Sequence, residues 1–255
     1  LEGYGVVRHA ALWVKNLPVM YVPFLIFPVK QKRQSGLLVP EIGYSDQNGL
    51  EYDQPLYWAI NDHSDATLCF HYMEKTGPKL GAEYRYISDH SQGTLMFDYL
   101  KDRKSENRKS QITNPRYWFR MKHDQKMPMG ISGMLDADIL SDPDFLHDFK
   151  DGYTGFDKTE AYFNKTFARD LDDYTDPVRV SSLNLNKTWS RYSLNAGARW
   201  YDDTMGNTDE MVHKLPVIRF DSLQQPILNT RFYWKLESEY SYLYSQENRS
   251  EERRV

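Results

Sequence analysis

The sequence predicts an all-β protein whose long antiparallel strands form part of a membrane-spanning barrel. Tyrosine and tryptophan are abundant, with 19 and 6 copies in 255 residues, and aromatic residues favour strands. Apolar and polar residues alternate over most of the chain, as in strands with one apolar face. Mean hydropathy is -0.72 and no run of 18 apolar residues exists, which excludes a helical membrane protein. A barrel remains compatible, because half of each strand faces a polar interior.

The first predicted elements are two strands at Tyr4–Val14 and Val19–Phe27. Prolines interrupt the second of these strands and the strand-like sequence that follows, at Pro23, Pro28, Pro40 and Pro55. Proline lacks the backbone donor that a sheet needs, so it is confined to edge strands, strand starts and bulges. We therefore expect the first strands of the sheet to be weakly paired.

Alternation with a period of two dominates after residue 36. In Asp65–Met73 the apolar positions are Ala66, Leu68, Phe70 and Tyr72. The same pattern over Arg231–Tyr244 exceeds ten residues, which is the length of a membrane strand. We predict about eleven strands, near residues 37–46, 48–60, 64–74, 79–89, 92–101, 115–125, 128–140, 178–189, 191–203, 212–221 and 230–245.

The connections between these strands differ in length. Those at 61–63, 90–91, 126–127 and 190 are short, and those at 102–114, 141–177 and 204–211 are long. Long extracellular loops and short periplasmic turns alternate in this way in outer-membrane barrels. A soluble β-sandwich also has alternating strands, but strand length and aromatic residues near both strand ends favour the membrane.

The acidic residues of segment 141–177 allow two interpretations. Calcium prefers carboxylate oxygens, but no EF-hand spacing is present, so we favour a solvated acidic loop. The loop contains Asp142, Asp144, Asp148, Asp151, Asp170, Asp172, Asp173 and Asp176.

Motifs for catalysis, metals and cofactors are missing from the sequence. No zinc, Walker A, Rossmann or GxSxG pattern occurs, so we expect no enzyme, no metal and no cofactor. The run Asp62-His63-Ser64-Asp65 is a turn, because adjacent residues do not form a catalytic relay. Cys69 is the single cysteine, which excludes an internal disulfide. The net charge of -4 gives no reason to expect nucleic acid.

Two segments resemble the LptD family of lipopolysaccharide-assembly proteins. They are PVMYVPFLIFPVKQKRQSGLLVPEIGYS, from Pro18 to Ser45, and QPLYWAINDHSDATL, from Gln54 to Leu68. The resemblance continues through Arg85-Tyr86 and the run Asp142-Pro143-Asp144-Phe145, and it is densest over residues 11 to 150. Several motifs in the same order make it far more specific than any one of them.

The resemblance implies a fold and a function. Residues 1–28 would be the end of a periplasmic β-jellyroll, and residues 29–255 the N-terminal part of a transmembrane barrel. The function would be transport of lipopolysaccharide and its insertion into the outer leaflet of the Gram-negative outer membrane. The implied partners are lipopolysaccharide, an LptE-like lipoprotein plug inside the barrel and an LptA-like periplasmic bridge protein.

The resemblance also implies roles for particular residues. Pro40 and Pro55 would weaken the pairing of the first barrel strands with the last strand and so form a lateral gate, or they are edge prolines without such a role. The seam between jellyroll and barrel would carry the lipid's acyl chains, although ordinary packing at the end of a sandwich uses the same residue types. Its residues are Pro18, Tyr21, Pro23, Phe24, Phe27 and Pro28.

A basic cluster follows the seam at Lys30, Lys32 and Arg33. Ammonium and guanidinium groups are suited to lipid phosphates, although a solvated turn explains the same charges. The chain starts inside strand-like sequence without a signal peptide. We therefore expect a fragment that leaves sheet edges open and neither inserts nor transports alone.

Two rival functions lack motif support. An outer-membrane enzyme of lipase type would need a serine and a histidine paired on neighbouring strands, and loss of lipid hydrolysis on mutating Ser64 or His71 would support it. A soluble sugar-binding β-sandwich would use Trp58, Trp118 or Trp200 as stacking platforms.

Overall fold

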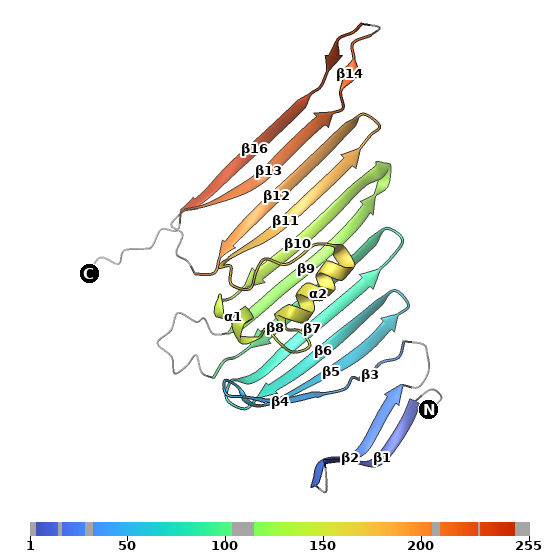
Figure 1. Cartoon of the computed structure of the whole chain (residues 1–255), viewed down its shortest axis with the longest axis vertical. Coiled ribbons are helices and arrows are strands. Elements are labelled where there is room, and N and C mark those ends of the chain that lie inside the picture. Colours follow the sequence, from blue (N-terminus) through green and yellow to red (C-terminus); the bar gives the residue numbers. More distant parts are fainter. Residues whose placement is uncertain are drawn as a thin grey trace, which may run out of the picture.

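The computed structural model describes residues 4–14, 17–28, 33–103, 115–205, 210–228 and 230–247. Strands β1 (Tyr4–Val14) and β2 (Leu17–Pro28) pair antiparallel and form a two-stranded sheet of their own. In Figure 1 this hairpin lies beside the start of the main sheet, near β3. The two strands expected at the start of the chain are thereby confirmed.

One antiparallel sheet contains twelve strands of the described part of the chain. Strands β5 to β13 lie side by side in chain order, and β16 pairs with β13 (Figure 1). The all-β prediction is confirmed. The strands after the first are β5 (Gly49–Asn61), β6 (Ser64–Met73), β7 (Gly77–Ile87), β8 (Ser91–Leu100), β9 (Arg116–Met127), β10 (Ile131–Leu140), β11 (Val178–Thr188), β12 (Tyr192–Asp203), β13 (Glu210–Ser222) and β16 (Glu237–Glu247). A short 3-10 helix, η1 (Pro128–Gly130), joins β9 to β10.

The first strand of the sheet is split, although the sequence predicted a single strand at 37–46. Strand β3 (Gly36–Leu37) and strand β4 (Glu41–Ser45) both pair with β5. Leu37 lies opposite Leu56, whereas Glu41 lies opposite Asp53. Residues 38–40 therefore face only residues 54 and 55, and the extra residue makes a bulge.

The last predicted strand, at 230–245, was wrong in its first half. Strands β14 (Gln225–Pro226) and β15 (Tyr233–Trp234) form a separate small hairpin, and the main sheet resumes at Glu237. The connection 223–236 is thus long, although it leaves from those ends of the strands at which the other connections are short turns. The alternation of long and short connections ends here.

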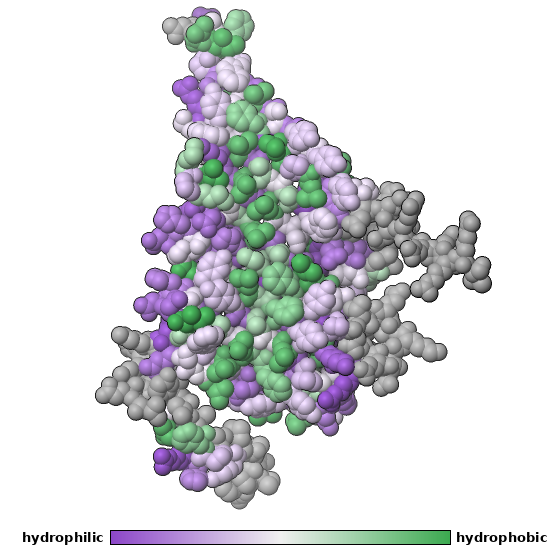
Figure 2. Space-filling view, turned by 180° about the vertical axis from the view of Figure 1, so that it is seen from behind, coloured by the Kyte–Doolittle hydropathy of each residue, from purple (hydrophilic) through white to green (hydrophobic). Residues whose placement is uncertain are grey.

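The two faces of the sheet have opposite polarity. On β6 the side chains of Leu68, Phe70 and Tyr72 are exposed, whereas those of Asp65 and His71 on the other face are buried. We call these the outer and inner faces. Figure 2 shows the outer face, where hydrophobic residues gather over the middle of the sheet. A water-soluble sheet would bury its apolar face instead.

Segment 141–177 covers part of the inner face and is called the inner segment. It contains helices α1 (Asp144–Asp148) and α2 (Phe156–Phe167), which lie over β7 to β10 (Figure 1). No helix in the described ranges has the length and apolar character needed to cross a membrane. The inner segment and the strands share an apolar core of Met73, Leu100, Trp118, Leu140, Phe145, Leu146, Phe149 and Phe156.

Candidate functional site: the first-strand seam and the inner face

The pairing between the first strand and β5 is incomplete at the two prolines. The Leu38 amide donates to the Pro55 carbonyl at 2.9 Å. The return bond is absent because proline has no N–H. Pro40 lies in the bulge two residues further on. We call this place, residues 36–40 against residues 54–57, the first-strand seam.

The first strand lies at the end of the sheet. Within the described ranges, β3 and β4 pair with β5 alone, so no strand pairs with their other edge. Val39 is 85% exposed and Tyr44 is 71% exposed. Of the two prolines predicted for the gate, Pro40 thus belongs to the edge strand and Pro55 to the strand that pairs with it. Their gating role stays a prediction.

Buried ion pairs fix the inner segment to the sheet. Asp98 and Arg120 pair on the inner face and are fully buried, and Lys79 lies 3.6 Å from Asp98. The Thr154 hydroxyl donates to Asp98 at 2.6 Å, and Arg120 donates to the Thr154 carbonyl at 2.8 Å. A Cβ at Gly81 would lie 3.1 Å from the Thr154 side chain, so a glycine here makes room for the segment.

A second buried cluster surrounds Arg116 at the start of β9. Its guanidinium binds Asp142 at two positions, at 2.8 and 3.0 Å. It also contacts Asp148 at 2.8 Å and Asp102 at 3.1 Å. The interpretation of 141–177 as a solvated acidic loop was therefore wrong for Asp142, which neutralises a buried arginine instead. Sequence reasoning missed Arg116 and Arg120 as its anchors.

The pKa values of two carboxylates in the inner segment depend on their surroundings. Burial raises the pKa of Asp172, which accepts a hydrogen bond from the Val180 amide at 2.9 Å. Hydrogen bonds from Thr175 lower the pKa of Asp173. In the described part of the chain no group of three or more His, Cys, Asp or Glu residues is arranged to hold a metal ion.

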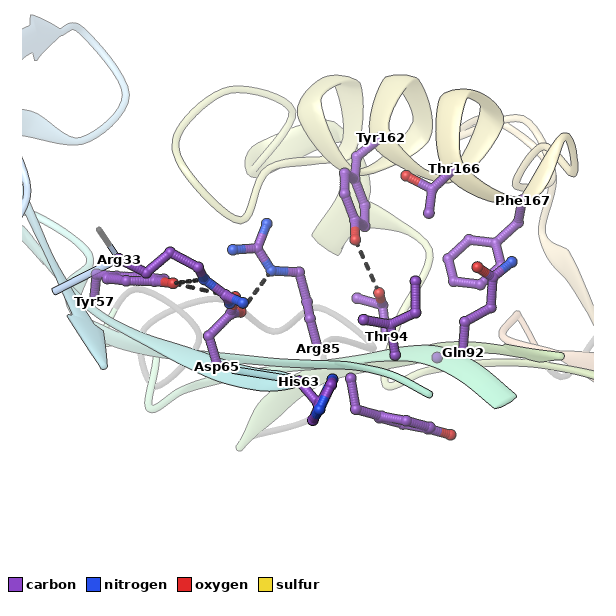
Figure 3. Close-up of a pocket in the computed structure, with 13 residues that line it drawn as sticks. Arg33, Tyr57, His63, Asp65, Arg85, Gln92, Thr94, Tyr162, Thr166 and Phe167 are labelled. Atoms are coloured by element: carbon purple, nitrogen blue, oxygen red, sulfur yellow. Dashed lines mark hydrogen bonds and ion pairs between the residues drawn. The ribbon is translucent and has the colours of Figure 1, made fainter. Parts of the chain in front are cut away.

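A pocket of about 430 Å³ opens between α2 and the inner face of β5 to β8 (Figure 3). The carboxylate of Asp65 pairs with both Arg33 and Arg85, the latter at 2.7 Å. Arg33 also donates to the Tyr57 hydroxyl at 2.9 Å. Two guanidinium groups share the Asp65 carboxylate, and Arg85 also lies 3.7 Å from the buried carboxylate of Glu83. The Tyr162 hydroxyl lies 3.1 Å from that of Thr94 across the pocket.

This pocket brings one residue of the predicted basic cluster into a defined setting. Arg33 is in it, whereas Lys30 and Lys32 lie outside the described residues. Arg85 was named only as part of the family resemblance, and the alternation marks it simply as a polar position. Only the register, which places Arg85 opposite Asp65, reveals the pair.

The residues predicted for the seam between jellyroll and barrel, which is distinct from the first-strand seam, all lie in β2. Tyr21 and Phe24 are both exposed, and the Tyr21 hydroxyl lies 2.5 Å from Nδ1 of His9. An odd and an even position point to opposite faces of a strand, so Tyr21 and Phe24 lie on different faces of β2, and their part in a lipid path stays a prediction. Pro23 is exposed on the face of Tyr21. The described backbone also includes Pro18, Phe27 and Pro28.

The geometry argues against particular residues of the rival functions, whereas Trp58 and Trp200 are exposed. Ser64 and His71 lie seven residues apart on the same strand, about 23 Å along it, and His71 contacts Glu51 at 3.0 Å instead. Trp118 is buried and donates its indole N–H to Asp138 at 2.8 Å, so its ring is not an open stacking platform.

These features define a protein with one large antiparallel sheet, an exposed apolar face, a polar inner face and a proline-weakened first strand. The sequence model of the LptD protein family matches residues 6–251. The chain belongs to the LptD family.

Individual relatives agree with this assignment. The LPS-assembly protein LptD of Ectopseudomonas mendocina is 32% identical over 186 residues, which is 72% of this chain and 20% of that protein. The protein of the same name from Actinobacillus pleuropneumoniae serotype 7 is 33% identical over 167 residues, 65% of this chain and 21% of that protein. The chain thus spans about a fifth of the length of these relatives.

Proposed function

We propose that this chain is the first part of the barrel wall of a protein that inserts lipopolysaccharide into the outer leaflet of the Gram-negative outer membrane. Relatives are named for lipopolysaccharide assembly. In this proposal residues 1–28 end a periplasmic jellyroll and residues 29–255 begin the barrel. The observation that carries it is the reversed polarity of the sheet, with apolar side chains outside and charged ones inside.

Hydrocarbon explains this reversal, because lipid is the solvent in which an exposed apolar face is stable. It also explains why the polar inner face contains buried arginine and aspartate pairs. The lumen of such a barrel is a polar passage for the sugar head group, while the acyl chains stay in apolar surroundings. The mechanism is differential solvation without covalent chemistry, so we propose a transporter rather than an enzyme.

The pocket beneath α2 is suited to a phosphate of the transported lipid. Arg33 is half-exposed and Arg85 is partly exposed, so both remain accessible from the lumen. Guanidinium groups bind phosphate oxygens with paired hydrogen bonds. In Figure 3 the Arg85 side chain rises from the sheet into the space beneath α2.

Two further surfaces are suited to the proposed partners. The inner face of β11 to β13 and β16 has a polar groove of about 400 Å³, with Asn195, Arg199 and Glu239 in its lining. This groove would receive an LptE-like lipoprotein. Strands β1 and β2 pair only with each other in the described ranges, and open strand edges accept strands from a partner, here an LptA-like bridge.

In this proposal the lateral gate lies between the first strand and the last strand of the complete barrel, and the first-strand seam lets the first strand bend away. Replacing Pro55 by alanine restores a backbone N–H opposite the Leu38 carbonyl, and replacing Pro40 by alanine restores a backbone N–H within the bulge. Each added hydrogen bond stabilises the closed seam by about 1 kcal/mol. We expect the double variant to deliver newly made lipopolysaccharide to the cell surface about tenfold more slowly, measured by pulse labelling in cells that depend on the complete protein.

Pro78→Ala is the matched control for this experiment. Pro78 also lies in a strand, on β7 opposite Tyr72, two strands beyond β5. We expect it to leave delivery unchanged. Normal delivery by the double variant, at equal amounts of assembled protein, would contradict the gate.

A further inference from the structure

The outer face of β5 contains one polar side chain in an apolar row. Alternation along the strand places Leu50, Tyr52, Leu56, Trp58 and Ile60 outward, and all five are exposed. Gln54 is the remaining member of this row. A primary amide that faces hydrocarbon is unfavourable unless its hydrogen bonds are made within the protein.

Gln54 makes those bonds across the first-strand seam. Its Nε2 donates to the Leu38 carbonyl at 3.0 Å and to the Pro55 carbonyl at 3.0 Å. Its Oε1 accepts from the Tyr52 hydroxyl at 2.8 Å. Both N–H groups and the carbonyl of the amide are therefore used, which allows the side chain to stay on this face.

The bond to Leu38 stands in the place of a missing backbone bond. The register makes Leu38 and Pro55 a directly opposed pair, and Leu38 N–H already donates to Pro55. In a regular antiparallel ladder residue 55 would return a bond from its own N–H to the Leu38 carbonyl. Proline has no such donor, and the Gln54 amide supplies it.

We propose that the Gln54 side chain is a replacement donor that closes the seam, and that lateral opening of the first strand begins with its release. The second half of this statement rests on the proposed function. A side chain leaves by rotation about its own bonds, whereas a backbone donor leaves only when the strand moves. The seam therefore has a latch that opens before the strand does.

Hydrogen exchange in the complete protein, assembled in membrane, tests the latch directly. Gln54→Leu keeps the size of the side chain and removes both donors. We expect amide exchange in residues 36–40 to become about tenfold faster, with no change in residues 41–45 beyond the bulge. Tyr52→Phe, which removes only the support of Oε1, should give a smaller increase in the same residues.

The decisive arm combines Gln54→Leu with Pro55→Ala. Alanine at 55 restores the backbone donor, so the same glutamine substitution should then change exchange in residues 36–40 less than twofold. An equal increase in both backgrounds would overturn the replacement role, as would unchanged exchange in the single variant.

The same variants separate the latch from the gate. If Gln54→Leu loosens residues 36–40 and also increases the uptake of large antibiotics, both parts of the proposal are supported. If it loosens these residues while uptake and lipopolysaccharide delivery stay normal, the replacement donor is supported and its part in opening is overturned.

Discussion

Replacing Arg116 by methionine is expected to detach the inner segment from the sheet. Methionine retains much of the apolar contact with Phe145 and Phe149, whose rings lie 5.5 Å from the guanidinium carbon, but leaves Asp142 buried without its cation. Removal of one partner of a buried ion pair costs about 3–5 kcal/mol. Limited proteolysis of the assembled complete protein should show cleavage within residues 141–177 at least about a hundredfold faster, because cleavage follows the open population.

Lys158→Met is the matched control in the same segment. Lys158 pairs with Glu41 at 2.7 Å, and both side chains are about half exposed. Such exposed pairs contribute below about 1 kcal/mol, so cleavage should change little. Equal cleavage of the two variants would show that the Arg116 cluster does not hold the inner segment.

A charge at the centre of the outer face is expected to block insertion into a membrane. Leu68 lies midway along β6 and is 48% exposed. Arginine at the middle of a bilayer costs a barrel strand about 2–4 kcal/mol, whereas near the interface the cost falls to about 0–1 kcal/mol. Leu68→Arg in the complete protein should therefore strongly reduce the amount recovered folded in the outer membrane.

Tyr72→Arg is the control for depth in this comparison. Tyr72 is on the same strand and face but near its end, so the same charge should be tolerated. If the two variants are recovered in equal amounts, the outer face does not meet hydrocarbon.

Strand positions could be predicted from the sequence because they depend on local alternation. Lipid on one side and a polar interior on the other impose a period of two on every strand, and β5 to β13 lie close to their expected ranges. The same signal misled at 230–245. Phe232, Trp234 and Leu236 continue the alternation through a small hairpin, so periodicity alone gave no sign of the break.

The inner segment could not be predicted in the same way, because long-range ion pairs attach it. Arg116 and Asp142 are 26 positions apart, and no local pattern pairs them. A helical signal was present, since Phe156, Thr159, Phe163 and Phe167 recur at spacings that place them on one face of α2. All four are buried.

At the first-strand seam, only some of the site residues could be predicted from the sequence. Pro40 and Pro55 stand out in the sequence because proline removes a donor. Gln54 does not, since its meaning depends on the register that places Pro55 opposite Leu38. A replacement donor can be recognised only once the missing bond has been located.

Photo-crosslinking of newly made lipopolysaccharide tests directly whether the lipid is released at the first strand. A photoreactive residue would replace Tyr44 beside the first-strand seam and, separately, Tyr99 on β8. Tyr99 is an exposed outer-face tyrosine that lies near the end of its strand, on the same side of the sheet as the β4–β5 turn. After a pulse of labelled lipid, we predict an adduct at position 44 before any at position 99. Simultaneous adducts at both positions, or none at position 44 in correctly assembled protein, would contradict release at the first strand.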